Sequence, residues 1–323
     1  MKKVILYTSC IATEDTGDEI AYEGCLHVIK ELFPEAFRIL FATHTPVPLV
    51  YNLKFFRDVG LKFACGTNIM DSNMFRPYRQ WDVTLLNAWH TGPVVLLGVG
   101  WRFYMGNPNF YTRLVYKNLL SKEHLHSVRD DYTLRKMQAM GFKNVINTSC
   151  PTMWKLTEEH CSKIPRKKAE NVLCTLTEFK KDPERDKRFM EILKENYKRV
   201  IFWVQAMKDY DYLQNELGAE KGVEILAPGL DNFDRVLTSD MDLDYVGTRL
   251  HGGIRALQKG RRTFIIGIDN RAAEKKRDFN LNVFERSDIE RLPEAVHQEV
   301  TTSIIVPTEN IKKWKDQFRK FYL

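Results

Sequence analysis

The chain has 323 residues, of which 44% are hydrophobic and 28% charged, proportions typical of a globular protein. This composition excludes a disordered chain, a collagen-like fibre and a small disulfide-rich protein, and the length corresponds to about two domains. The formal net charge is +7. Because nucleic-acid binders concentrate positive charge in dense blocks and only short basic stretches occur here, the excess favours an anionic small molecule or an acidic surface, and no nucleic acid, as partner.

Cysteine usage and the N-terminus bear on the compartment. The six cysteines are irregularly spaced and no C-x-x-C occurs, which is typical of free thiols in a reducing cytosol and not of a disulfide framework or a zinc site. Lys2-Lys3 before the apolar run Val4–Tyr7 resembles a signal peptide only weakly, because Thr8-Ser9 ends the run and acidic residues follow. We therefore interpret this segment as a buried β-strand.

Residues 83–101 contain no Asp, Glu, Lys or Arg, over about the length of a membrane span. Polar residues and the Gly92-Pro93 pair interrupt the stretch, so two elements joined by a turn fit it better than one spanning helix. We expect a cytoplasmic protein with at most a peripheral association with the inner face of the membrane.

A short apolar run, a polar turn and an amphipathic helix recur along the first half of the chain. The predicted strands are Val4–Tyr7, Phe37–Ala42, Val94–Leu97, Leu125–Val128 and Asn144–Ile146. Apolar residues at helical spacing over 25–32 indicate a helix that Pro34 ends. A second helix is expected to begin at a cap formed by Asp130 or Asp131 and to end near Gly141.

A second series of the same kind begins near residue 170. Its predicted strands are Asn171–Leu176, Arg199–Val204, Val223–Leu226, Leu243–Val246 and Thr263–Ile268, with helices over 184–197, 208–217, 231–238 and 251–259. Alternating strands and helices imply parallel sheets with right-handed crossovers.

The two series predict an α/β protein with two Rossmann-like domains whose parallel sheets face a cleft. We expect an N-terminal domain over 1–160 on the acceptor side and a C-terminal domain over 161–306 on the donor side. They should be joined near 151–170, through Pro151 and the polar stretch Ser162–Glu170. A last helix over 307–323 should follow Pro307 with Thr308 as its cap. Its apolar face is expected to pack back on the first domain and consists of Ile311, Trp314, Phe318 and Phe321.

Ligands of open parallel sheets bind beyond the carboxyl ends of the strands, and four loops there hold suitable residues. In the first, Gly17 allows a tight turn, and Asp18 either caps the next helix or contacts a substrate hydroxyl. The second contains Gly98, Gly100 and Trp101, where the glycines permit close approach of a ligand or simply form a packing turn.

In the third loop Arg129 lies between a strand and a helix N-terminus, which suits an anion or, alternatively, a salt bridge with Asp130. The fourth, 247–253, opens a helix with His251 in its first turn. The helix dipole there disfavours an extra proton unless an anion binds, so His251 is either an acid or a capping or core histidine. The other histidines lack this setting, and we expect His90, His124 and His126 to be surface or loop residues; no clustered ligands predict a metal.

These segments together resemble the polysaccharide pyruvyl transferase family. The similar motifs are Thr16-Gly17-Asp18-Glu19, Gly98-Val99-Gly100, Ser127-Val128-Arg129-Asp130-Asp131-Tyr132-Thr133 and Gly247-Thr248-Arg249-Leu250-His251. The chain departs from the family at Cys150-Pro151-Thr152, where many members carry Asp-Pro, and we expect a structural consequence there.

The resemblance implies a glycosyltransferase-B-like pair of Rossmann domains that use phosphoenolpyruvate as co-substrate, with no cofactor and no metal. The acceptor is a saccharide, such as a lipid-linked oligosaccharide of exopolysaccharide or cell-envelope synthesis, which receives a pyruvate ketal. The implied donor-binding residues are Arg129, Arg249, the backbone of Leu250, and His251. We expect His251 to act as the catalytic acid and Asp18 to orient or deprotonate the acceptor.

Two other classes remain open at this point. A glycosyltransferase with a nucleotide-sugar donor would share the architecture, and retaining enzymes of that class often hold the donor with two carboxylates about eight residues apart in the second domain. That pattern is missing here, because the nearest acids after His251 are Asp269 and Glu274, five apart. A non-catalytic protein that binds an anion or a saccharide would show no turnover. The basic C-terminal face either approaches anionic lipid or is merely solvated; it consists of Lys312, Lys313, Lys315, Arg319 and Lys320.

Overall fold

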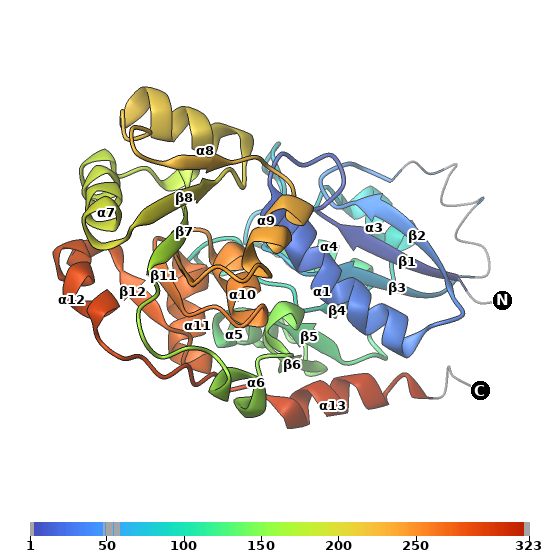
Figure 1. Cartoon of the computed structure of the whole chain (residues 1–323). Coiled ribbons are helices and arrows are strands. Elements are labelled where there is room, and N and C mark those ends of the chain that lie inside the picture. Colours follow the sequence, from blue (N-terminus) through green and yellow to red (C-terminus); the bar gives the residue numbers. More distant parts are fainter. Residues whose placement is uncertain (1–2, 48, 50–53, 55–58, 320–323) are drawn as a thin grey trace. The chain divides into compact units, whose positions relative to one another are not determined.

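The computed structural model describes residues 3–47, 49, 54 and 59–319, and these form two compact units (Figure 1). Unit 1 contains the described parts of 1–13, 21–154 and 306–323, and unit 2 contains 14–20 and 155–305. The division between Trp154 and Lys155 precedes the boundary that we drew at residue 160. The segment 14–20, which follows the first strand, belongs to unit 2 although the rest of its helix belongs to unit 1.

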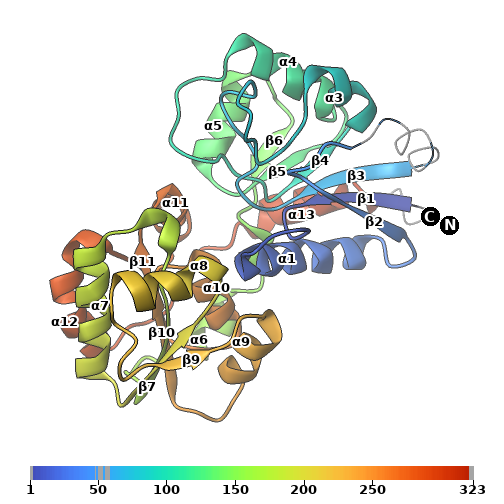
Figure 2. The ribbon, with the colours of Figure 1, turned by 90° about the horizontal axis from the view of Figure 1, so that it is seen from above.

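Unit 1 is built on parallel strands, as predicted from its apolar runs. The strands are β1 (Lys3–Thr8), β2 (Phe37–Ala42), β3 (Val59–Cys65), β4 (Val95–Leu97), β5 (His126–Val128) and β6 (Val145–Asn147). Hydrogen bonds order them as β2-β1-β3-β4, and β5 pairs with β6 (Figure 2). A bridge between Val99 and Val128 links the two groups just beyond β4.

The alternation of side chains along β1 supplies two separate apolar cores. Val4 and Leu6 pack in a cluster with α1 (Thr16–Leu32) and α13 (Thr308–Asp316). Ile5 and Tyr7 pack in a second cluster on the other face of the sheet. The helices of that face are α3 (Leu85–Thr91), α4 (Phe110–Leu119) and α5 (Asp131–Ala139). The sheet of unit 1 is therefore covered on both faces, as a parallel sheet requires.

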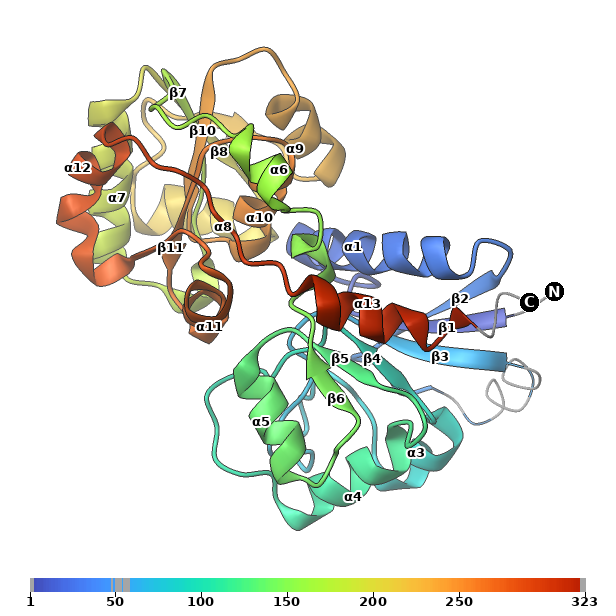
Figure 3. The same cartoon turned by 90° about the horizontal axis from the view of Figure 1, so that it is seen from below.

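The last helix, α13, belongs to unit 1 and packs on the same apolar core as α1 (Figure 3). Trp314 and Phe318 are fully buried, and Phe63 of β3 meets both rings at centroid distances of 6.2 and 5.4 Å. Phe321 lies outside the described residues. The expectation that Thr308 caps the helix is wrong: the cap position is Pro307 and Thr308 is the first helical residue.

Unit 2 contains one six-stranded parallel sheet. Its strands are β7 (Asn171–Thr175), β8 (Arg199–Trp203), β9 (Glu224–Leu226), β10 (Leu243–Gly247), β11 (Thr263–Gly267) and β12 (Val283–Glu285). They are ordered β12-β11-β10-β7-β8-β9, so the direction of winding reverses between β7 and β10. Such a reversal is the topological switch point at which α/β sheets bind their ligands.

Helices cover both faces of this sheet. They are α6 (Glu158–Ser162), α7 (Pro183–Asn196), α8 (Met207–Asp211), α9 (Leu230–Leu237), α10 (Leu250–Gln258), α11 (Asn270–Phe279) and α12 (Leu292–His297). Val172 and Phe202 face a core shared with α7 and α12, whereas Leu173 and Trp203 face a core shared with α9 and α10. Within the described residues, no helix is long and apolar enough to cross a membrane.

Candidate functional site

The carboxyl ends of β7 and β10 form the centre of the candidate site in unit 2. Gly247 ends β10 next to Thr175, the last residue of β7. A Cβ atom on Gly247 would lie 2.3 Å from the Thr175 hydroxyl, so only glycine allows this close approach. The loop that follows therefore passes directly over the switch point, and its next residues are Thr248 and Arg249.

Arg249 is buried, with 4% of its surface exposed, and its guanidinium is fixed by acceptors on several elements of unit 2. Nε donates to Asp209 Oδ2 at 3.0 Å and to the carbonyl of Leu176 at 3.2 Å. Nη2 contacts Asp209 Oδ1, and Nη1 lies 3.0 Å from Asp15 Oδ2. The ring of Phe179 lies 5.4 Å from the guanidinium carbon. The cation is thus held in one orientation by two carboxylates.

Asp209 belongs to the first turn of α8 and is completely excluded from solvent. Its carboxylate accepts the N–H of Ala206 at 3.0 Å and that of Glu178 at 3.3 Å, besides the contacts with Arg249. Burial raises the pKa of Asp209 to about 6, against the opposing effect of Arg249. For Arg249, burial lowers the pKa, but Asp15 and Asp209 outweigh it and the net shift is upward. Arg249 therefore stays cationic.

Asp15 brings the segment 14–20 to the same cluster. Its Oδ1 accepts the N–H of Gly17 at 2.7 Å and the amide of Gln205 at 2.8 Å, while its Oδ2 faces Arg249. A Cβ on Gly17 would lie 2.5 Å from the Gln205 amide nitrogen, which explains the glycine. Asp18 is half-buried in the first turn of α1. Within the segment 14–20, the carboxylate that reaches Arg249 is thus that of Asp15, and the assignment of Asp18 to the acceptor stays a prediction.

Leu250 and His251 open α10, directly after the Arg249 cap position. Both are buried, and His251 has 6% of its surface exposed. The next residue, Gly252, approaches Tyr245 of β10 so closely that a Cβ would lie 2.7 Å from its hydroxyl. The helix N-terminus, with its outward N–H groups and positive dipole end, is therefore fixed against the sheet beside Arg249, an arrangement suited to an anion.

Unit 1 holds the other predicted arginine. Arg129 follows β5, is 1% exposed, and its Nε lies 3.3 Å from Asp130 Oδ2. Asp130 caps α5 through the N–H of Thr133 at 2.7 Å. A Cβ on Gly100 would lie 2.0 Å from Arg129 Nε, so the guanidinium lies against the bare backbone of Gly100. The salt bridge with Asp130, one of the two alternatives considered for Arg129, is therefore present, and the binding of an anion by Arg129 stays a prediction.

The other residues of the Gly98–Trp101 loop serve packing. Gly98 has a left-handed backbone with φ of 64°, and a Cβ there would lie 2.1 Å from Pro151. Its N–H donates to Ser127 Oγ at 2.8 Å. Trp101 is fully buried, and its indole N–H donates to Ser72 at 3.1 Å. The structure brings this loop together with Arg129 within unit 1, and its predicted role towards a substrate remains untested.

Sequence reasoning did not single out Asp209, Asp15 or Gln205. Asp209 lies in a polar helical run (Lys208-Asp209-Tyr210-Asp211) that resembles a solvent-exposed helix turn. Its only available signal is position, because α8 follows β8 at the carboxyl edge of the sheet. Asp269, whose spacing from Glu274 departs from the carboxylate pair of nucleotide-sugar glycosyltransferases, caps α11 through the N–H of Arg271 at 2.9 Å.

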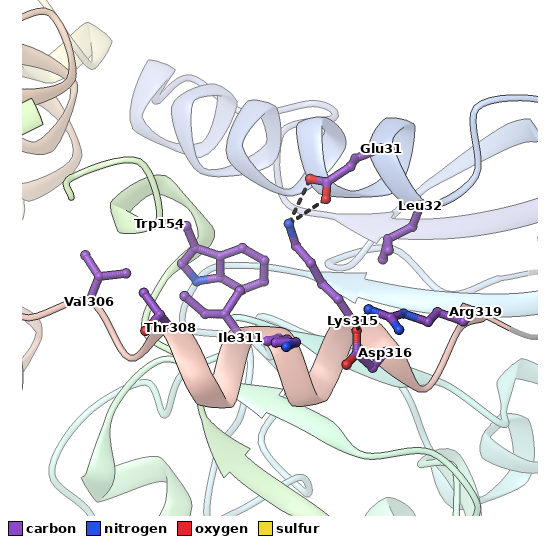
Figure 4. A pocket seen from close by; sticks show the side chains of 10 residues that line it. Glu31, Leu32, Trp154, Val306, Thr308, Ile311, Lys315, Asp316 and Arg319 are labelled. Atoms are coloured by element: carbon purple, nitrogen blue, oxygen red, sulfur yellow. Dashed lines mark hydrogen bonds and ion pairs between the residues drawn. The ribbon is translucent and has the colours of Figure 1, made fainter. Parts of the chain in front are cut away.

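A separate cavity of about 520 Å³ lies between α1 and α13 in unit 1 (Figure 4). Trp154 and Ile311 contribute apolar surface, and the Lys315 ammonium crosses to Glu31 at 2.8 Å. Two residues of the basic C-terminal face pair with neighbouring acids: Lys315 with Glu31, and Arg319 with Asp316.

All six cysteines are free thiols. Within the described residues, no three His, Cys, Asp or Glu side chains gather into a group able to hold a metal ion. In unit 2, Arg249 and the N-terminus of α10 can neutralise an anion, and in unit 1 Arg129 offers a second guanidinium group.

Comparison with known proteins identifies the class. Residues 15–270 match the model of the polysaccharide pyruvyl transferase family. The chain therefore belongs to the polysaccharide pyruvyl transferase family, a family of transferases, as its motifs indicated. No curated protein matches the chain.

Solved structures confirm the glycosyltransferase-B-like fold. A structure of S. aureus MnaA with UDP is 10% identical, covers 93% of this chain and 92% of its own, and has a TM-score of 0.55. A UDP-N-acetylglucosamine 2-epimerase is 10% identical, covers 98% of this chain and 90% of its own, and has a TM-score of 0.50. At such identities these likenesses show the α/β fold alone.

Proposed function

We propose that this protein transfers the enolpyruvyl unit of phosphoenolpyruvate to a saccharide and forms a pyruvate ketal. The observation that carries the proposal is the buried Arg249, fixed at the switch point of unit 2 beside the N-terminus of α10 with His251 in its first turn, in a chain of the pyruvyl transferase family. Phosphoenolpyruvate carries a phosphate and a carboxylate, and both are recognised by guanidinium forks and helix N-termini.

The reaction balances without any cofactor. An acid protonates the methylene carbon of phosphoenolpyruvate, and positive charge develops at its C2 atom. Two hydroxyl oxygens of the sugar bond to C2, and the bond from C2 to the phosphate oxygen breaks. Of the two hydroxyl protons released, one replaces the proton given up by the acid and the other leaves with inorganic phosphate.

The proposal assigns each step of the reaction to individual residues. His251 is the acid, because a bound anion at the helix N-terminus stabilises its protonated form. Arg249 neutralises an anionic group of the donor, and the backbone of Leu250 contributes an N–H. Arg129 and Asp18 keep the roles that the family resemblance implies: a donor-binding guanidinium, and a carboxylate that orients or deprotonates an acceptor hydroxyl. The proposal also includes that the acceptor is lipid-linked and lies at the inner face of the membrane.

Mass spectrometry of oligosaccharides incubated with phosphoenolpyruvate tests this function. We expect a gain of about 70 Da per acceptor, the mass of the ketal group, together with release of phosphate. His251→Gln should lower the turnover roughly 10²- to 10⁴-fold, the usual contribution of a general acid. The exposed Phe37→Ala is the matched control. Transfer from a UDP-sugar in place of phosphoenolpyruvate, or no transfer from either donor, would refute the proposal.

A further inference from the structure

Two loops at the carboxyl edge of unit 1 expose an unusual number of aromatic side chains. Residues 66–84 follow β3 and residues 98–109 follow β4. We call four of their side chains the aromatic platform: Phe75, Tyr78, Phe103 and Tyr104, which are 67%, 86%, 41% and 57% exposed. Monomeric proteins seldom leave large apolar side chains gathered at the surface unless they form a binding site.

Hydrogen bonds tie the two loops to each other. The N–H of Met70 donates to the carbonyl of Gly100 at 3.2 Å, and the carbonyl of Met70 accepts the N–H of Arg102 at 2.8 Å. The Ser72 hydroxyl donates to the carbonyl of Gly106 at 2.7 Å, and the backbone carbonyl of Ser72 accepts the N–H of Asn109 at 3.1 Å. The loops that carry the platform are therefore fixed to one another.

Ring contacts hold individual platform members. The ring of Phe75 stacks on Tyr111 of α4 at a centroid distance of 3.9 Å. Tyr104 meets Tyr132 of α5 edge to face at 5.0 Å, and the Tyr132 hydroxyl accepts the N–H of Met105 at 2.7 Å. Rings that are fixed before binding lose little conformational entropy when a ligand arrives.

Charges within these loops largely cancel. Arg102 lies 3.8 Å from Asp71, and Arg79 pairs with Asp82. An anionic membrane surface attracts clusters of unpaired basic residues, so the pairing argues against lipid as the occupant. A sugar ring fits the same chemistry better, because its face of C–H groups packs on the electron-rich face of an aromatic ring while its hydroxyls stay in water.

The platform shares a loop with the arginine site of unit 1. Gly100, whose backbone lies against Arg129, is followed by buried Trp101 and then by Phe103 and Tyr104. A sugar that stacks on these rings is held at the same carboxyl edge as Arg129.

We propose that the aromatic platform binds the saccharide acceptor by stacking its rings. The inference rests on the proposed pyruvyl transfer and assigns its acceptor site.

Oligosaccharide binding by the intact protein tests the platform. The probe is an array of gluco-, galacto- and chito-oligosaccharides, applied to the wild type and to Tyr78→Ala and Tyr104→Ala. We expect binding by the wild type and a loss of roughly threefold to tenfold in affinity for each ring removed. Phe37→Ala is the matched control, since Phe37 is 62% exposed but begins β2 at the opposite edge of the sheet. It should bind as the wild type does.

A second readout separates this inference from the proposed function. Thermal stabilisation by phosphoenolpyruvate should be equal in the wild type and the platform variants, because the donor residues are unchanged. Wild-type affinity in Tyr78→Ala and Tyr104→Ala, an equal loss in Phe37→Ala, or no oligosaccharide binding by the wild type would overturn the acceptor assignment. Saccharide binding that depends on the platform, without any ketal formed from phosphoenolpyruvate, would instead refute the proposed function.

Discussion

Asp209 holds Arg249 through both of its carboxylate oxygens, and the two side chains are 0% and 4% exposed. They come from different elements of unit 2: Asp209 from α8 after β8, and Arg249 from the loop after β10. A buried ion pair of this kind adds little net stability by itself but is costly to break, because the remaining charge loses its partner. The pair therefore determines where the guanidinium points.

Asp209→Asn should destabilise the protein and weaken donor binding together. Arg249 would keep its buried charge with only Asp15 as a carboxylate partner, and we expect the free energy of unfolding to fall by about 3 kcal/mol. Urea unfolding measures the loss. Asp234→Asn is the matched control in the same unit, since its pair with Arg255 is partly exposed and should contribute less than about 1 kcal/mol. Equal losses in the two variants would show that burial of the Asp209 pair has no special weight.

Asp15→Asn should strengthen the binding of phosphoenolpyruvate. The Asp15 carboxylate lies 3.0 Å from Arg249 Nη1, where it competes with an anionic oxygen of the donor for the same N–H. Removing its charge removes this competition, and we expect roughly fivefold tighter binding, equivalent to about 1 kcal/mol. Isothermal calorimetry measures the dissociation constant. Weaker binding in the variant would mean that Asp15 positions Arg249 for the donor and does not compete with it.

The apolar runs predicted most strands because local sequence suffices for them. The strand over Phe37–Ala42 coincides with β2, and the five strands predicted in the second half correspond to β7–β11. β3 was missed because Lys62 interrupts its apolar pattern. Lys62 is nevertheless buried, since its ammonium donates to the carbonyls of Thr91 and Gly92 at the end of α3. Only the tertiary fold supplies those acceptors.

The same distinction applies to the candidate site. Arg249, Leu250 and His251 are adjacent in sequence, so one motif indicates all three. Asp209 reaches Arg249 across 40 residues of sequence, and no local pattern predicts such a contact. His126 shows the converse error: it was expected at the surface or in a loop, yet β5 buries it completely.

Gly100→Ala should impair activity by displacing Arg129. The added methyl group would lie 2.0 Å from Arg129 Nε, so the guanidinium must move. Overpacking of this kind costs about 1–3 kcal/mol of stability, and we expect a larger loss in kcat/KM for phosphoenolpyruvate, roughly 10²-fold. Steady-state kinetics on the folded variant provide the test. Gly106→Ala, where a Cβ meets nothing within 4 Å, should retain wild-type kinetics. A fully active Gly100→Ala enzyme would exclude Arg129 from donor binding.

The stability of the protein should fall as the pH drops from about 6.5 to about 4, and His126 should be one cause. Its Nδ1 accepts the N–H of Leu96 at 3.2 Å, which requires an unprotonated nitrogen, and its Nε2 donates to the carbonyl of Ser121 at 2.8 Å. Burial lowers the pKa of His126 to about 4. The unfolded chain therefore takes up the proton first, so the contribution of neutral His126 is present above pH 6.5 and is lost on acidification.

The corresponding loss is about 3 kcal/mol between these two pH values. Urea unfolding over a pH series, compared between the wild type and His126→Gln, isolates it: the variant should show a smaller fall in the free energy of unfolding. His27→Gln, which changes an exposed histidine on α1, should follow the wild type. If His126→Gln loses stability with the same pH dependence as the wild type, the imidazole is not kept neutral by its burial in β5.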